Sequence, residues 1–208
     1  MSDDVSRETT GAPSTPDSAR GAFPSERWAL AERYAELLAT EGVVRGLIGP
    51  RESPRLWDRH LLNSAALAAA VPQGATVCDV GSGAGLPGIV LAIARPDVHV
   101  TLLEPLLRRT TFLLEAVEDL GLSAQVAVDR GRAEERHGQA TYAVVTTRAV
   151  APLEKLLRWC MPLVAPRGAL VAMKGASAAD EVASAASVLR TLGCSEPEVL
   201  TLAQPWLT

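Results

Sequence analysis

Three glycines that follow a short apolar run could bring the backbone of this chain close to a bound ligand. Gly81, Gly83 and Gly85 stand at alternate positions, and without a Cβ atom the backbone can turn sharply there and approach a ligand closely. A dinucleotide-binding fingerprint, G-x-G-x-x-G, needs glycine or alanine at its sixth position. Leu86 stands at that position. The spacing therefore indicates a nucleotide-like ligand that is not a dinucleotide.

An acidic residue ends the next predicted strand. The run at 98–103 is apolar and β-branched, and Glu104 follows it, nineteen residues after Gly85. In nucleotide-binding α/β folds an acid at about this distance accepts hydrogen bonds from ribose hydroxyls. Because the carboxyl ends of adjacent parallel strands meet at one edge of a sheet, we expect Glu104 and the glycine turn to share a site.

Further polar side chains follow the later strands. Arg132, Ala133 and Glu134 come after the third predicted strand, Arg148 ends the fourth and Lys174 ends the fifth. Each has an alternative explanation, since Arg148 could be a surface arginine and Lys174 a solvated strand end.

The elements that position these residues alternate along the chain. Ser25 can begin a helix that ends near Gly42, and a second helix is predicted from about 55 to 71. Strands are predicted at about 75–80, 98–103, 124–128, 141–147 and 168–173, with helices at about 87–94, 106–120, 151–160 and 177–192. This alternation is typical of an α/β fold with a doubly wound, mostly parallel sheet. The ligand belongs at the carboxyl edge of such a sheet, beside the first strand.

Composition predicts one compact domain with extensions. The chain has 208 residues, of which 48% are hydrophobic, and charges interrupt every apolar run before membrane-spanning length. We divide it into a disordered tail at 1–24, a helical extension at 25–72 and a main domain at 73–208. The tail lacks the apolar region of a signal peptide, so we expect a cytoplasmic protein, and we expect a monomer. Three cysteines without a C-x-x-C pair argue against a disulfide framework and a metal site.

The distribution of charge favours a nucleic-acid partner despite a net charge of −4. Residues 27–174 carry 17 basic and 15 acidic side chains, a net charge of +2, so the acidity lies in the flanks. Three basic groups stand out, and their members are Arg51, Arg55, Arg59 and His60, then Arg108 and Arg109, then Arg130, Arg132, Arg136 and His137. Arginine suits phosphate because its planar fork bonds two oxygens. Solvated faces of an arginine-rich protein are the alternative explanation.

Together these pieces resemble a known family. The run from Asp79 to Leu107, with its G-x-G-x-G turn, is similar to motif I of the class I S-adenosylmethionine-dependent methyltransferases, and in detail to the glucose-inhibited division protein B family. The other matching pieces are Arg59-His60-Leu61-Leu62-Asn63-Ser64, Arg132-Ala133-Glu134, Thr147-Arg148-Ala149 and Met173-Lys174-Gly175. They cover roughly residues 25–175 in the family's order.

The resemblance implies an enzyme that transfers a methyl group from S-adenosylmethionine to N7 of a guanine in 16S ribosomal RNA, free or in the 30S subunit. It implies cofactor contacts at Gly81, Leu86, Ala133, Glu134 and Arg148, to which we add Gly83, Gly85 and Glu104. We expect Arg148 to position the cofactor or the RNA, and no general base. Arg59, His60, Arg108, Arg109 and Lys174 are the candidates for RNA contact.

Missing motifs agree with methylation of a ring nitrogen. Enzymes that methylate an exocyclic amine typically carry Asn or Asp followed by Pro-Pro-aromatic after the fourth strand, whereas this chain has Thr147-Arg148-Ala149 there. Cys78 lies within a predicted strand and Cys160 ends a helix, so neither suits a cytosine-C5 enzyme. Guanine N7 has an in-plane lone pair and no proton, so its methylation needs no general base. Positioning of the nitrogen in line with the methyl carbon and the sulfur can be sufficient.

Three alternatives remain open from the sequence. One is a methyltransferase that acts on another RNA or on a small molecule. Another is a nicotinamide-dependent oxidoreductase, although Leu86 breaks its fingerprint. The third is a non-catalytic RNA-binding protein, which would not need Glu104 or Glu134.

The carboxyl-terminal part departs from the class I methyltransferase pattern. The final strand hairpin of such a sheet is expected to be incomplete, because 198–202 is the single strand candidate after the fifth strand.

Overall fold

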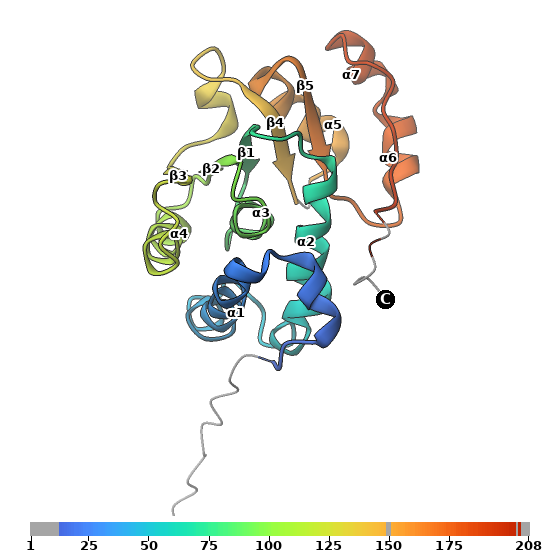
Figure 1. Ribbon diagram of the computed structural model, residues 1–208. Helices are drawn as coiled ribbons and strands as arrows, with labels where there is room; N and C mark the ends of the chain where they lie inside the picture. Colours follow the sequence, from blue (N-terminus) through green and yellow to red (C-terminus); the bar gives the residue numbers. More distant parts are fainter. Residues whose placement is uncertain (1–12, 149–150, 203, 205–208) are drawn as a thin grey trace, which may run out of the picture.

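A five-stranded parallel sheet forms the centre of the molecule (Figure 1). The computed structural model describes residues 13–148, 151–202 and 204. The strands are β1 (Thr76–Val80), β2 (His99–Leu103), β3 (Val126–Asp129), β4 (Tyr142–Thr147) and β5 (Val164–Ala172). They lie in the order β3-β2-β1-β4-β5, and every neighbouring pair is parallel. The predicted doubly wound α/β fold is therefore confirmed, with its switch point between β1 and β4.

Helices cover the sheet as the crossovers require. They are α3 (Gly88–Ala94), α4 (Leu107–Asp119), α5 (Leu153–Cys160), α6 (Ala178–Ser184) and α7 (Ala186–Thr191). Successive side chains of β1 point to opposite faces of the sheet. Val77 therefore packs in the core cluster with α3, and Cys78 packs in the cluster with α5. The single helix predicted at 177–192 is divided at Ala185, whose ψ of 1° departs from helical geometry.

The amino-terminal helices join the core beside α3. They comprise α1 (Trp28–Leu37), the π-helical turn η3 (Leu38–Gly42), the 3-10 turn η4 (Ser53–Arg55), the π-helical turn η5 (Leu56–Leu61), α2 (Leu62–Ala66) and the 3-10 turn η6 (Leu67–Ala70). Tyr34 and Leu61 pack in one continuous hydrophobic cluster with Val77 and Leu91 of the main domain. The extension thus shares its core with the sheet, and Figure 1 shows α1 and α2 next to α3.

Part of the predicted disordered tail is folded. Residues Asp17–Ala22 form a 3-10 helix, and Ala19, Ala22 and Phe23 are buried. The ring of Phe23 meets Trp57 edge-on, with centroids 6.5 Å apart. The prediction of disorder is therefore wrong for 17–23, because these few apolar side chains complete the core in spite of polar neighbours. Residues 1–12 of the predicted tail lie outside the described residues.

The strand candidate at 198–202 is not a strand. Its residues have no regular structure, and Val199 and Leu200 are exposed. Within the described ranges, no strand follows β5, which pairs with β4 alone. In the same ranges, no helix has the length and apolar character to cross a membrane.

Candidate active site

The glycine turn after β1 takes the shape that its sequence predicts. Gly81, Gly83 and Gly85 have φ values of 72°, 59° and 93°, in the region that favours glycine. Packing adds a second constraint at Gly85, because a Cβ there would lie 2.8 Å from the hydroxyl oxygen of Tyr34. At Gly81, by contrast, a Cβ would meet no described atom within 4 Å. The turn is therefore packed beneath Gly85 and open at Gly81.

Gly88 explains how the helix after the turn approaches the strand. A Cβ at Gly88 would lie 2.8 Å from Oδ2 of Asp79, and the Gly88 amide donates to that oxygen at 3.0 Å. In the dinucleotide fingerprint the third glycine has this packing role. Here the close helix–strand contact falls two residues later, which is why Leu86 can occupy the sixth position.

Glu104 lies beside the turn, as its place in the sequence predicts. The carboxylate is almost fully buried and accepts two main-chain hydrogen bonds of 3.0 Å, from Gly83 to Oε2 and from Leu106 to Oε1. Arg109 lies 3.7 Å from Oε2. Since each carboxylate oxygen has two lone pairs, Glu104 can hold the turn and still accept from a ligand.

Asp79 is a site residue that was not predicted from the sequence. It is fully buried near the end of β1, and its Oδ1 has no hydrogen-bond partner among the described residues. Burial raises the pKa of Asp79 to about 7, against the opposing hydrogen bond from Gly88. The sequence did contain a signal for this role, because Asp79 is an acidic residue one position from the end of the strand that precedes the glycine turn.

Arg148 faces this group of residues from the neighbouring strand. Asp79 pairs with Thr146 in the β1–β4 register, so Arg148 lies two residues further along at the level of the turn. Its Nη2 donates to Nδ1 of His60. Its Nη1 is buried and finds no partner in the part of the chain that the structure describes. Burial lowers the pKa of Arg148, yet an arginine side chain stays protonated in proteins.

The turn after β3 reaches the same edge. Ala133 begins the 3-10 helix η7 (Ala133–Arg136) and packs in one cluster with Val80 and Leu103, which end β1 and β2. Glu134 is exposed next to it. Arg136 holds Asp129 through two hydrogen bonds of 2.7 and 2.6 Å, which fixes the loop between them. Leu86 lies in the glycine turn, where its amide donates to the carbonyl oxygen of Ser82 at 3.1 Å. The edge thus gathers all the cofactor residues predicted from the sequence.

The predicted RNA contacts separate into surface and interior residues. Arg59 and Arg108 are exposed, and Arg109 is partly exposed beside Glu104. His60 is 9% exposed, with both ring nitrogens engaged. Lys174 donates to Glu181 at 2.6 Å and to the Ala151 carbonyl at 2.8 Å. Because both side chains are largely buried and already hydrogen-bonded, His60 and Lys174 expose little surface that could contact RNA directly.

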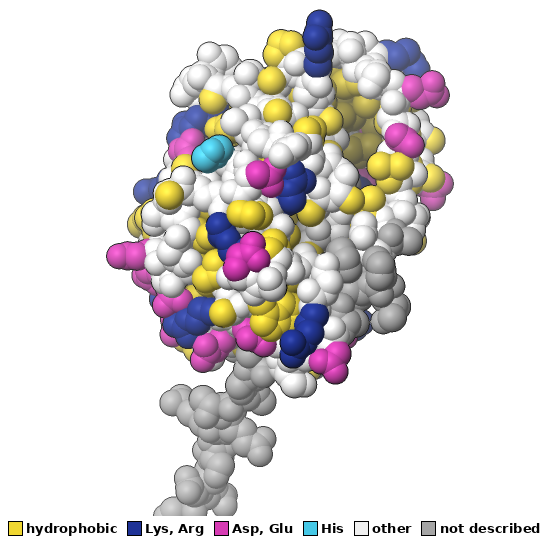
Figure 2. All heavy atoms as spheres, viewed as in Figure 1, with side chains coloured by type: hydrophobic (Ala, Val, Ile, Leu, Met, Phe, Trp, Pro, Cys, Tyr) yellow, Lys and Arg dark blue, Asp and Glu magenta, His cyan; other side chains and the backbone are white. Residues whose placement is uncertain are grey.

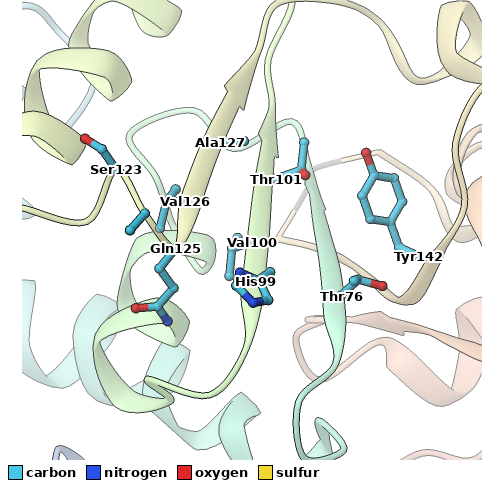
Figure 3. A pocket seen from close by; sticks show the side chains of 10 residues that line it. Thr76, His99, Val100, Thr101, Ser123, Gln125, Val126, Ala127 and Tyr142 are labelled. Carbon is cyan, nitrogen blue, oxygen red and sulfur yellow. The ribbon is translucent and has the colours of Figure 1, made fainter.

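A shallow hollow lies away from this edge, over the beginnings of the strands (Figure 3). It measures about 190 Å³ and contains none of the predicted site residues. The residues that line it are Thr76, His99, Val100, Thr101, Ser123, Ala124, Gln125, Val126, Ala127 and Tyr142. The segment that connects β3 to β4 contains the short helix η7. This helix packs near the ends of β1 and β2 and does not cover the hollow at the beginnings of the strands.

The model of the GidB family, rRNA small subunit methyltransferase G, matches residues 27–205. The chain belongs to this family. Two GidB-family relatives, both called ribosomal RNA small subunit methyltransferase G, come from Nocardioides sp. (strain ATCC BAA-499 / JS614) and Salinispora tropica. The first is 65% identical over 202 residues, which are 97% of this chain and 79% of the relative. The second is 60% identical over 196 residues, 91% and 81% of the two chains.

Membership of the GidB family confirms the resemblance found in the sequence. The chain is an S-adenosylmethionine-dependent methyltransferase of small-subunit ribosomal RNA, and the oxidoreductase alternative is not favoured.

Solved structures agree with the fold of this GidB-family chain. Trm5b from Pyrococcus abyssi superposes with a TM-score of 0.53 at 15% identity, over 68% of this chain and 41% of that one. A precorrin-6y C5,15-methyltransferase from Geobacter metallireducens gives 0.50 at 15% identity, over 71% and 74%.

Proposed function

We propose that this enzyme methylates N7 of a guanine in 16S ribosomal RNA, and that Asp79 and Arg148 hold the amino-acid end of S-adenosylmethionine. That end carries an ammonium and a carboxylate. Oδ1 of Asp79 and Nη1 of Arg148 are buried polar atoms of opposite charge, each without a partner among the residues described. Because unpaired buried groups are costly, a ligand that pairs with both is strongly favoured.

The other cofactor contacts follow from the same edge. The Glu104 carboxylate would accept from the ribose hydroxyls, and the turn at Gly81 and Gly83 leaves room for the ligand to approach the backbone. The main chain at Ala133 and the carboxylate of Glu134 would meet the adenine ring. These assignments are supported by the shared position of all the groups at the carboxyl ends of β1, β2 and β3.

Methyl transfer to N7 needs orientation more than proton transfer. Bound S-adenosylmethionine would supply a methyl group that the in-plane lone pair of N7 can accept, and the electron pair of the broken C–S bond would stay on sulfur. Positive charge would therefore move from the sulfonium to the guanine ring, with no proton removed. Holding the nitrogen, carbon and sulfur in line can lower such a barrier by roughly 7–11 kcal/mol. Arg148 contributes by fixing the donor's carboxylate away from the guanine ring.

The RNA would approach over the exposed arginines that flank this edge. Arg59 and Arg108 are exposed. Arg59 precedes His60, which bonds Arg148, and Arg108 precedes Arg109, which lies beside Glu104. Phosphate contacts from such side chains supply affinity without sequence preference. Figure 2 shows basic and acidic side chains interspersed on the face in view.

Analysis of ribosomal RNA tests the proposal directly. Nuclease digestion and mass spectrometry of 16S RNA from cells with and without the gene should show the loss of one 7-methylguanosine. Purified enzyme with S-adenosylmethionine should restore it on RNA or on 30S subunits from the deletion strain. A missing methyl group on any atom other than N7 would overturn the assignment.

A further inference from the structure

Three side chains from separate segments form a continuous hydrogen-bonded series that ends at the cofactor edge. Glu52 Oε2 lies 2.9 Å from Nε2 of His60. Nη2 of Arg148 donates a hydrogen bond to Nδ1 of the same ring. A guanidinium group donates and does not accept. Nδ1 must therefore accept, so His60 is neutral and carries its proton on Nε2, which donates to Glu52.

The local backbone directs His60 towards Arg148. His60 lies in the π-helical turn η5, whose wider winding changes the direction of side chains relative to an α-helix and is frequent at functional sites. Its ring is largely buried, whereas Arg59, the residue before it, is exposed. Glu52 is held in turn by Arg59, which donates to Oε1 at 3.0 Å. The series is thus fixed at its outer end.

We propose that His60, oriented by Glu52, is a positioning residue that holds the Arg148 guanidinium with its Nη1 edge turned towards the cofactor. This inference rests on the proposed contact between Arg148 and the donor's carboxylate. Arginine has a long side chain with several rotatable bonds, and an acceptor on one edge restricts the orientation of the other. His60, predicted from the sequence to contact RNA, then acts through Arg148 instead.

The series depends on the protonation of His60. The charged groups that face His60 are Glu52, Arg59 and Arg148, and burial followed by the charge of Arg148 lowers the pKa of its imidazole. Protonation would place an N–H against the Nη2 donor and a second positive charge beside the guanidinium. The hydrogen bond between Arg148 and His60 therefore requires a neutral imidazole, and it should be lost when acid protonates His60.

Nitrogen-15 NMR of the full chain tests the assigned tautomer. The chain contains three histidines, and His60→Asn identifies the signals of His60 by their loss. At neutral pH we expect a protonated Nε2 and an unprotonated Nδ1. A proton on Nδ1 of His60, alone or together with one on Nε2, would overturn the proposal.

Cofactor affinity tests whether His60 acts through Arg148. Titration calorimetry with S-adenosylhomocysteine should show about tenfold weaker binding for His60→Ala, as expected for the loss of a hydrogen bond to a charged group. His60→Asn should keep most of the affinity, because its side-chain oxygen can take the place of Nδ1. His99→Ala, an exposed histidine in the distant hollow, is the matched control and should bind normally.

A double-mutant cycle separates this inference from the proposed function. In an Arg148→Ala background, His60→Ala should weaken binding no further. If its effect persists there in full, His60 does not act through Arg148 and the inference is wrong. Formation of 7-methylguanosine by the wild-type enzyme is measured separately, so the proposed reaction can stand while this inference is overturned.

Discussion

The hydroxyl of Tyr34 donates a hydrogen bond of 2.6 Å to the main-chain oxygen of Ala84. Tyr34 is fully buried in α1, and Ala84 lies in the middle of the glycine turn. The amino-terminal helices thus support the turn from beneath and are part of what shapes the cofactor site.

Replacement of Tyr34 by phenylalanine should therefore affect both stability and binding. It leaves a buried carbonyl without its donor, which costs about 1–3 kcal/mol of unfolding free energy. Urea denaturation measures that loss, and calorimetry with S-adenosylhomocysteine should show weaker binding because the turn is less restrained. Tyr142→Phe, at the start of β4, is the matched control, and an equal loss of affinity there would contradict this explanation.

Replacement of Gly85 by alanine should be more damaging than replacement of an unpacked glycine. A left-handed residue with a Cβ costs roughly 1–2 kcal/mol, and at Gly85 the new atom would also lie 2.8 Å from the Tyr34 hydroxyl. Gly121→Ala also has a positive φ, of 64° against 93° at Gly85, with no described atom within 4 Å of its Cβ, so it reports the cost of a left-handed backbone without a packing clash. Equal changes in melting temperature for the two variants would show that the packing constraint is unimportant.

Asp79→Asn should stabilise the free protein while weakening cofactor binding. The folded pKa of about 7 lies above the ordinary value of 3.8, so the folded state binds more protons and stability falls as pH rises from about 4 to about 7. The difference of about three pKa units corresponds to about 4 kcal/mol, which the neutral amide would recover at pH 8.

Two measurements check the Asp79 prediction. Denaturation of wild type and Asp79→Asn between pH 4 and pH 8 should give curves that converge in acid and separate towards neutral pH. Affinity for S-adenosylhomocysteine should fall in the variant at pH 8. A variant with unchanged affinity would show that Asp79 does not meet the cofactor's ammonium.

Arg148→Ala should abolish most methyl transfer, with a loss of at least about 100-fold in kcat/KM, because a charged hydrogen-bond partner in a buried site is removed. Arg148→Lys should recover little, since an ammonium cannot bond His60 and the cofactor along two edges. Incorporation of labelled methyl groups into 30S subunits measures both. Near-normal activity of Arg148→Ala would exclude the role assigned to this residue.

Lys174→Met should lower the melting temperature more than it lowers RNA binding. Its ammonium bridges Glu181 of α6 and the carbonyl of Ala151, and the pKa of Glu181 is lowered first of all by this lysine. Because that pKa is depressed in the folded state, the stabilisation should be lost as pH falls through it. Glu181→Gln should mimic the thermal effect. A large loss of RNA affinity with unchanged melting would instead restore the RNA contact predicted from the sequence.

The sequence by itself determined the order of strands and helices, the glycine turn and the acid after β2. These features depend on local patterns: apolar periodicity, backbone freedom at Gly81 to Gly85, and the spacing to Glu104. The same patterns misjudged the segment at 17–23, since a few apolar side chains in a polar stretch become informative only when a core is present to receive them.

Only the tertiary structure decided which charged side chains face solvent and which face one another. His60 and Lys174 look like ordinary basic residues in the sequence, yet both are largely enclosed and paired. Asp79 and Arg148 are far apart along the chain, and parallel pairing of β1 with β4 brings them to the same edge of the sheet, with Arg148 two residues beyond the partner of Asp79. Burial and the electrostatic cost of an unpaired charge depend on neighbours from the whole chain, so no local pattern could reveal them.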